Sequence, residues 1–296
     1  MDERILYRIA GHTLCVEGAP EVAGLNELPG FPVFRTEEGE AEWTVRFGCD
    51  VTEPEGCTVL STFDFEDSVI HSRFERKDGT FYYVMEPADP SVPTMVLRYA
   101  GGASVEATRA SNPTMLRFSL WMSMGMMGLP SRMLLIHAST IVHQNRAVIF
   151  LGESGTGKST HTRLWLKNIP DAHLLNDDSP VLAIEEGRPV VYGSPWSGKT
   201  HCYHPYRFPL AAAVRLSQAP HNRIRRLNVI EAVAALQPSC PPALAQDDRF
   251  ADGIMEILSD TIAHIPVFHL ECLPDDDAAH TSHDAIFGEM CKCDNV

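Results

Sequence analysis

A phosphate-binding pattern occupies residues 152–159, which read Gly152-Glu153-Ser154-Gly155-Thr156-Gly157-Lys158-Ser159. The spacing G-x-x-x-x-G-K-[ST] is satisfied at every defined position. Glycines in such a loop let the backbone curl so that successive N–H groups point at phosphate oxygens, and the positive end of a following helix adds to the attraction. The loop therefore predicts a binding site for the phosphates of a nucleotide.

The side chains of this loop have separate expected partners. Lys158 would reach the β- and γ-phosphates, and Ser159 would offer its hydroxyl to Mg²⁺, a cation that prefers oxygen ligands. Six further positions are expected to contact the nucleotide, namely Gly152, Ser154, Gly155, Thr156, Gly157 and Thr160. ATP and Mg²⁺ are the expected cofactors, although the sequence does not distinguish ATP from another nucleotide donor.

Two adjacent carboxylates and a histidine could share this site. Asp177 lies 19 positions after Lys158, which leaves room for one helix and one strand before Asp177 and Asp178 return to the phosphates. One carboxylate could hold Mg²⁺ while the other takes a proton from an attacking hydroxyl, and His137 could orient a carboxylate or exchange protons with it. The alternatives are a simple turn before Pro180 and a buried structural histidine.

The elements expected around the loop belong to an α/β domain. A strand over 133–142, a turn at 144–145 and a strand over 146–151 lead into the loop, and a helix over 160–167 and a strand over 173–178 follow it. Further strands are expected over 181–184, 189–192, 211–216 and 267–270, and helices over 229–236 and 249–263. This mixture of elements predicts a domain over residues 109–296.

Residues 1–108 read instead as a smaller β-rich domain. Alternating apolar and polar residues predict strands over 5–9, 13–16, 43–47, 69–74, 80–85 and 95–99. With Lys77-Asp78-Gly79 as a hairpin turn, this pattern predicts an antiparallel sheet with one solvated face. Asn112 is expected to cap a buried helix that runs to Met127.

Composition limits the classes of partner. The formal net charge of −15 disfavours nucleic acid and anionic membranes, which reward an excess of lysine and arginine. The first residues lack the pattern of a secretory signal, and the apolar stretch 116–129 is too short to span a bilayer. A cytoplasmic protein is therefore expected, with its eight scattered cysteines reduced.

Three segments in order, "LLIHASTIV", "GESGTGKST" and "LLNDDSPVL", resemble the C-terminal domain of HPr kinase/phosphorylase and, more loosely, the ATP-binding half of phosphoenolpyruvate carboxykinase. The resemblance covers about residues 130–270 and is strongest in the first fifty. It implies an HPr kinase/phosphoenolpyruvate carboxykinase-like fold and Mg²⁺-dependent transfer of the γ-phosphoryl group to a hydroxyl. It also implies Asp177 as the base, with Asp178 and His137 in a supporting network; Ser159 and Asp178 are then expected to serve Mg²⁺.

This chain departs from that family at several positions. Thr160 stands where the kinases usually carry glutamate. Their glycine- and arginine-rich segment is replaced here by residues 191–199. These residues resemble a segment of divergent HPr-kinase-like proteins that are often linked to peptide-modifying or biosynthetic gene sets. HPr is therefore not the expected substrate. Lys199 and Arg223, the latter within the cluster 223–226, are candidates for gripping phosphate or an anionic acceptor.

Three functions remain open on the sequence. The first is a kinase that phosphorylates a serine or threonine hydroxyl of a protein or peptide; the second is a kinase of the same fold for a small molecule. The third is a nucleotide-gated binding module without transfer. An edge strand or groove in the first domain would favour a peptide acceptor, whereas a closed pocket would favour a small molecule. The parent kinases form hexamers, so a homo-oligomer is one arrangement that the resemblance allows.

Overall fold

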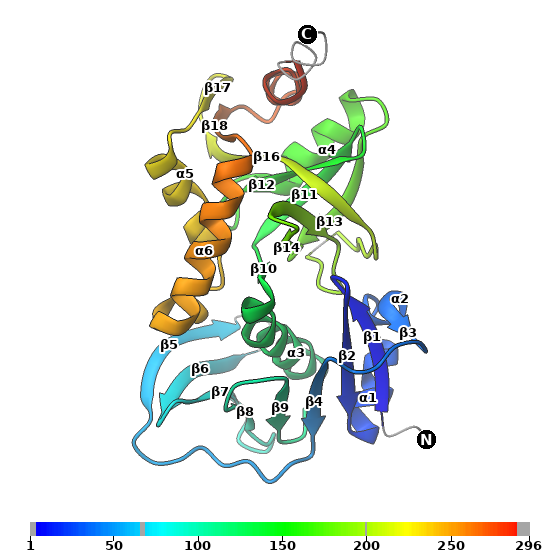
Figure 1. The fold of residues 1–296 in the computed structure, drawn as a ribbon, viewed down its shortest axis with the longest axis vertical. Helices are drawn as coiled ribbons and strands as arrows, with labels where there is room; N and C mark the ends of the chain where they lie inside the picture. The colour runs from blue at the N-terminus through cyan, green and yellow to red at the C-terminus, as the bar shows by residue number, and fades with distance from the viewer. Residues whose placement is uncertain (1–3, 66–68, 199, 289–296) are drawn as a thin grey trace. The chain divides into compact units, whose positions relative to one another are not determined.

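The computed structural model describes residues 4–65, 69–198 and 200–288, and the chain forms two compact units (Figure 1). The first unit comprises the chain up to Ser131 together with Pro242–Gly253, and the second comprises Arg132–Pro241 and the chain from Ile254 onward. This division differs from the expected boundary at 108/109. The difference arises because the helix after residue 108 packs on the sheet of the first unit.

The first unit contains a nine-stranded sheet in the order β3-β1-β2-β4-β9-β8-β7-β6-β5. Its strands are β1 (Arg4–Ile9), β2 (His12–Glu17), β3 (Arg35–Thr36), β4 (Trp43–Phe47), β5 (Thr58–Phe65), β6 (Ile70–Lys77), β7 (Thr80–Pro87), β8 (Met95–Tyr99) and β9 (Ser104–Ala107). The hairpin turn predicted at Asp78 and Gly79 is confirmed, and both residues adopt positive φ angles.

The expectation of a purely antiparallel sheet is wrong at β4, which runs parallel to both β2 and β9. The reason is the long connection from β2 to β4, which contains α1 (Ala19–Glu27), α2 (Phe31–Phe34) and β3. Such a connection returns the chain to the starting end of the sheet, so that the next strand runs in the same direction.

The helix predicted after Asn112 is confirmed as α3 (Pro113–Gly128), whose first turn is capped by the Asn112 side chain accepting from Met115 N at 3.0 Å. It packs against α1 and against β4, β7 and β8. The short turn η1 (Leu129–Ser131) follows it. The apolar residues of α3 are therefore part of the core of the first unit, as their distribution around the helix predicted.

Residues 242–253 join this unit through side chains. The ring of Phe250 lies 4.7 Å from that of Phe81, and the guanidinium of Arg249 lies 4.5 Å from the Phe81 ring centre. Arg76 forms an ion pair with the buried carboxylate of Asp247.

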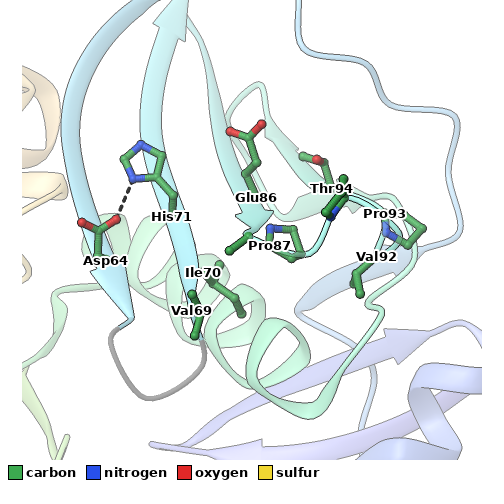
Figure 2. A pocket seen from close by; sticks show the side chains of 11 residues that line it. Asp64, Val69, Ile70, His71, Glu86, Pro87, Val92, Pro93 and Thr94 are labelled. Atoms are coloured by element: carbon green, nitrogen blue, oxygen red, sulfur yellow. Dashed lines mark hydrogen bonds and ion pairs between the residues drawn. The ribbon is translucent and has the colours of Figure 1, made fainter.

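A pocket of about 750 Å³ opens elsewhere in the same unit, where β5 ends, β6 begins and β7 ends (Figure 2).

The second unit contains a mixed sheet in the order β10-β14-β15-β16-β12-β11-β13, to which β18 and β17 are added beside β16. Its strands are β10 (Met133–Leu135), β11 (Ala138–His143), β12 (Arg146–Leu151), β13 (His173–Asp178), β14 (Val181–Glu185), β15 (Arg188–Tyr192), β16 (Arg207–Gln218), β17 (Arg223–Arg226) and β18 (Val267–Cys272). Strands β12, β16 and β18 are parallel, and β11 is antiparallel to both β12 and β13.

The strand expected over 133–142 is in fact two strands, which is a correction with a clear cause. β10 pairs with β14, whereas β11 pairs with β12 and β13. Between them, Ile136 N donates to Pro180 O at 3.1 Å and His137 N donates to Ser239 O at 2.7 Å. The break leaves His137 outside both ladders, at the edge where β12 and β13 end.

The helices of the second unit are α4 (Lys158–Asn168), α5 (Val229–Leu236) and α7 (Asp276–His283), and α6 (Asp248–His264) ends in it. Short helical turns are η2 (Gln237–Ser239), η3 (Leu244–Gln246, in the first unit) and η4 (Asp284–Gly288). α4 packs on β11, β12 and β13 through Trp165, which is fully buried with Phe150 in a continuous apolar core. Within the described ranges, no helix is long and apolar enough to cross a membrane.

Candidate active site

The phosphate-binding pattern forms the connection from β12 to α4. Gly157 is the N-cap residue of α4 and adopts a left-handed conformation (φ 103°, ψ 17°) that a residue with a side chain rarely adopts. No side chain of the described residues caps this helix. The first N–H groups of α4 therefore point out of the helix without a capping partner, which is the arrangement that binds phosphate oxygens.

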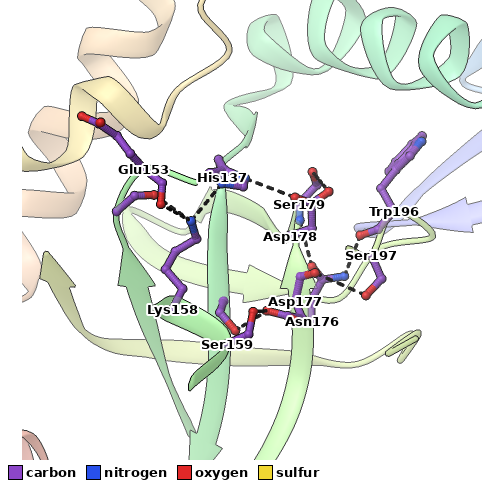
Figure 3. Close-up of polar contacts among 12 residues, drawn as sticks. His137, Glu153, Lys158, Ser159, Asn176, Asp177, Asp178, Ser179, Trp196 and Ser197 are labelled. Carbon is purple, nitrogen blue, oxygen red and sulfur yellow. Dashed lines mark hydrogen bonds and ion pairs between the residues drawn. The ribbon is translucent and has the colours of Figure 1, made fainter. Parts of the chain in front are cut away.

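Lys158 lies at the centre of the site (Figure 3). Its ammonium donates to Gly152 O at 2.7 Å and to Glu153 O at 3.2 Å, and it lies 2.9 Å from Nε2 of His137. Burial lowers the pKa of Lys158 against the opposing attraction of Asp178 and Asp177. A partly desolvated ammonium at this position would interact strongly with phosphate oxygens.

The contacts of Lys158 set the tautomer of a neutral His137 ring. An ammonium has three donors and no acceptor, so Nε2 of His137 must be the acceptor in the 2.9 Å contact. The ring proton of the neutral imidazole then lies on Nδ1, which is 3.2 Å from Oδ1 of Asp178. Lys158, His137 and Asp178 thus form one continuous chain of donors and acceptors (Figure 3).

Asp177 has a different environment from Asp178, because adjacent strand residues face opposite ways. Oδ1 of Asp177 accepts from Ser139 Oγ at 2.7 Å and from Ser159 Oγ at 3.1 Å. Asp177 is only 5% exposed, whereas the side chain of Asp178 is 31% exposed. The carboxylate that contacts the loop hydroxyl Ser159 is therefore that of Asp177, whereas Asp178 is the residue expected from the sequence to share Mg²⁺ with Ser159.

The segment 193–198 positions the end of β13. The amide of Asn176, which is fully buried, donates to Trp196 O at 3.0 Å and accepts from Ser179 N at 3.0 Å. The backbone N–H of Gly198 donates to Asp177 O at 2.6 Å. The contacts of this segment fix the backbone from which both carboxylates project.

Gly198 allows this close approach, so its replacement should disturb the carboxylates. A Cβ at position 198 would lie 2.9 Å from Asp177 O and 3.4 Å from Asp178 Cβ. We expect Gly198→Ala to displace β13 and to lower any turnover at this site by about tenfold or more, at a cost of about 1–3 kcal/mol in stability. Turnover measurements and unfolding in urea check this against Gly253→Ala, whose Cβ would meet its nearest neighbour at an ordinary 3.8 Å. Unchanged turnover in Gly198→Ala would contradict the positioning role.

Arg215 is a site residue that the sequence reasoning missed. It lies on β16 in register with Leu151, the last residue of β12, and its guanidinium is 3.6 Å from the carboxylate of Glu153. Its positive charge also contributes to the lowered pKa of Lys158. The signal was a single arginine within the apolar run Ala211–Leu216 of a buried strand.

A pocket of about 570 Å³ adjoins the loop on the side away from the carboxylates' strand. Its lining includes loop and α4 residues and the ends of β16 and β18, namely Gly155, Thr156, Gly157, Thr160, His161, Leu164, Leu216, Gln218, Ala219, Cys272, Leu273 and Pro274. The volume and the mostly apolar lining with a few polar groups are typical of a small-molecule site.

His161 in this lining makes the second unit sensitive to acid. Burial lowers the pKa of His161 to about 4, and its Nε2 is 3.0 Å from Ser282 Oγ. The unfolded chain takes up a proton below about pH 6.5 while the folded ring stays neutral, so stability is complete above that pH and is lost as the pH falls toward 4.

For a group whose pKa is 6.5 in the unfolded chain and about 4 in the folded chain, the free energy of unfolding falls by about 3 kcal/mol between pH 6.5 and 4. We expect His161→Leu to remove most of this pH dependence. Unfolding in urea at pH 7 and pH 4.5 measures it, and His173→Gln, at an exposed position, is the matched control. Equal acid sensitivity of the native chain and His161→Leu would show that another group is responsible.

One predicted site residue, Arg223, is not brought to the loop, and another lies outside the described residues. Arg223 lies on β17, which β18 and β16 separate from β12. Lys199 lies outside the described residues.

Within the part of the chain that the structure describes, no group of three or more His, Cys, Asp or Glu side chains is arranged to hold a metal ion. The donor set of one carboxylate and one hydroxyl suits Mg²⁺, which commonly takes only one or two protein ligands and completes its shell with phosphate oxygens and water.

Comparison with known proteins adds little to this geometry. No family model matches the chain, and no curated protein matches it. Among solved structures, the chain is similar to the Hpr(Ser) kinase/phosphatase from Coxiella burnetii, with 12% identity and a TM-score of 0.32 over 54% of this chain and 99% of that chain. This is a weak fold-level similarity, and the function is argued from the site alone.

Proposed function

We propose that the protein is an ATP- and Mg²⁺-dependent kinase that transfers a phosphoryl group to a serine or threonine hydroxyl of a protein or peptide. The observation that carries the proposal is the arrangement of two carboxylates at one phosphate loop. The carboxylate of Asp177 accepts a hydrogen bond from the loop hydroxyl of Ser159. The carboxylate of Asp178 contacts His137, which in turn contacts the loop cation Lys158. A site that only binds a nucleotide would need the loop but not the second carboxylate.

The two carboxylates would divide the work by their contacts. Asp177, buried beside Ser159, would share with it the binding of Mg²⁺, which supplies charge neutralisation on the transferred phosphoryl group when bound. Asp178 is the more exposed carboxylate and would take the proton of the acceptor hydroxyl. The acceptor oxygen then bonds to the γ-phosphorus as the bond from that phosphorus to the bridging oxygen breaks. The reverse assignment, with Asp177 as base, is the one that the resemblance implied.

The remaining groups would bind and orient the donor. Lys158 and Arg215 would neutralise phosphate charge from two sides of the loop, and the N–H groups at the start of α4 would bind phosphate oxygens. The 570 Å³ pocket beside Gly155 and Thr160 would hold the base and sugar of the nucleotide. His137 would hold Asp178 in place as a positioning residue.

Transfer from γ-labelled ATP to a peptide library tests the proposal directly. The expected result is Mg²⁺-dependent label on peptides that contain serine or threonine, and no label on a matched library in which alanine replaces both. Label only on small metabolites would instead identify a small-molecule kinase. Nucleotide binding by calorimetry without transfer or hydrolysis would identify a binding module and overturn the proposal.

A further inference from the structure

Strand β5 forms one margin of the sheet in the first unit. In the described residues it pairs with β6 and with no other strand. A bulge interrupts the pairing between Val59 and Ser61, but from Ser61 to Phe65 the register is regular. This segment is long enough to pair on its outer side with about five residues of another extended chain. Val59 on this strand is 51% exposed.

A pocket begins where this margin ends. Asp64 of β5, His71 of β6 and Glu86 of β7 are cross-strand neighbours and form one polar row in its lining (Figure 2). Most of the remaining lining is apolar, with Val69, which is 64% exposed, and further residues Pro87, Pro90, Val92 and Pro93. A side chain that enters here would meet carboxylates at one side and apolar carbon at the other.

The charge around this pocket is strongly negative. Among the described residues from 50 to 94 there are eight aspartates or glutamates but three lysines or arginines. Arg73 is shared among Glu53, Glu75 and Glu86, at 2.7–2.9 Å from each, so one cation faces three carboxylates. The side chain of Asp64 is 71% exposed and that of Glu86 is 53% exposed. None of the described residues that line the pocket is a lysine or arginine.

We propose that the outer margin of β5 and the adjoining pocket bind an extended peptide segment that carries lysine or arginine. Backbone pairing with β5 would supply affinity, and the row formed by Asp64 and Glu86 would select a basic side chain. A second copy of this chain is a poorer occupant, because it would bring an equally acidic margin against the first. This binding does not require phosphoryl transfer; if the proposed function also holds, the segment belongs to the acceptor.

Fluorescence anisotropy with the full chain tests this proposal. The probe is a labelled octapeptide in which lysine alternates with valine and threonine, and its counterpart carries glutamate at each lysine. We expect the lysine peptide to bind at least about tenfold more tightly. Alternate backbone N–H groups of an extended peptide point to opposite edges, so N-methylation along the edge that pairs with β5 should abolish binding, whereas N-methylation along the other edge should not. Equal binding of the two peptides, or tolerance of N-methylation on both edges, would overturn the proposal.

Variants of the chain separate this site from general attraction between opposite charges. Asp64→Asn combined with Glu86→Gln should weaken binding about fivefold or more, because it removes two exposed carboxylates from the pocket. Glu27→Gln combined with Glu37→Gln removes the same charge from exposed positions of the first unit outside the pocket, and should change affinity less than about twofold. Equal weakening by both pairs, or self-association in sedimentation without peptide binding, would refute the assignment.

Discussion

Asp178→Asn is expected to lower the rate of phosphoryl transfer by about 10³-fold while changing nucleotide affinity by less than about threefold. The physical reason is that asparagine keeps the shape of the side chain but cannot take a proton. Asp178 is also the carboxylate that His137 holds and that solvent reaches. Single-turnover transfer and nucleotide titration in the presence of Mg²⁺ measure the two quantities separately.

The comparison with Asp177→Asn gives this prediction its discriminating power. Loss of the carboxylate beside Ser159 should raise the Mg²⁺ concentration needed for half-maximal transfer, and high Mg²⁺ should restore part of the rate. If high Mg²⁺ instead restored transfer in Asp178→Asn and not in Asp177→Asn, the roles would be exchanged and Asp177 would be the base. Wild-type transfer by both variants would rule out either carboxylate as base.

Lys158→Met is expected to reduce kcat/KM for ATP by about 10³-fold or more, because it removes the loop cation while keeping the length of the side chain. The decrease in kcat/KM should exceed the decrease caused by removing an exposed charge, because the Lys158 ammonium is partly desolvated and donates hydrogen bonds to the carbonyls of Gly152 and Glu153. Steady-state kinetics with ATP and a serine-containing peptide measure the effect.

Lys167→Met is the matched control for this variant. Lys167 lies on the same helix, and its ammonium forms an exposed ion pair with Asp276. It should retain kcat/KM within about twofold, as is usual for an exposed pair. A similar loss in both variants would mean that the helix, and not the cation at its first position, had been disturbed.

The local elements of the site could be predicted because they depend on short-range patterns. The loop, the helix after it and the strand that ends in Asp177 and Asp178 each follow from a periodicity or a fixed spacing, and the structure confirms the elements. The Asn112 cap and the turn at Asp78 are confirmed for the same reason, since a few neighbouring residues decide them.

The features that could not be predicted depend on residues distant along the chain. The break at His137 is set by Pro180 and Ser239, which accept the two N–H groups there. Arg215 reaches the loop only because β16 pairs with β12 in parallel, and a parallel pairing leaves no local signal. The partner of Ser159 likewise depends on the register in which β13 pairs with β11, because that register decides which of the two adjacent aspartates points toward α4.

The composition of the first unit from two separate stretches of chain has a consequence for the order of its assembly during synthesis. Phe250 packs against Phe74 and Phe81, yet more than a hundred residues of the second unit are translated between them. The sheet of the first unit emerges from the ribosome early but lacks this closing stretch until residue 253 has been made. Contacts so distant in sequence form late, so the first unit is expected to complete its core after most of the second unit's sheet is available to fold.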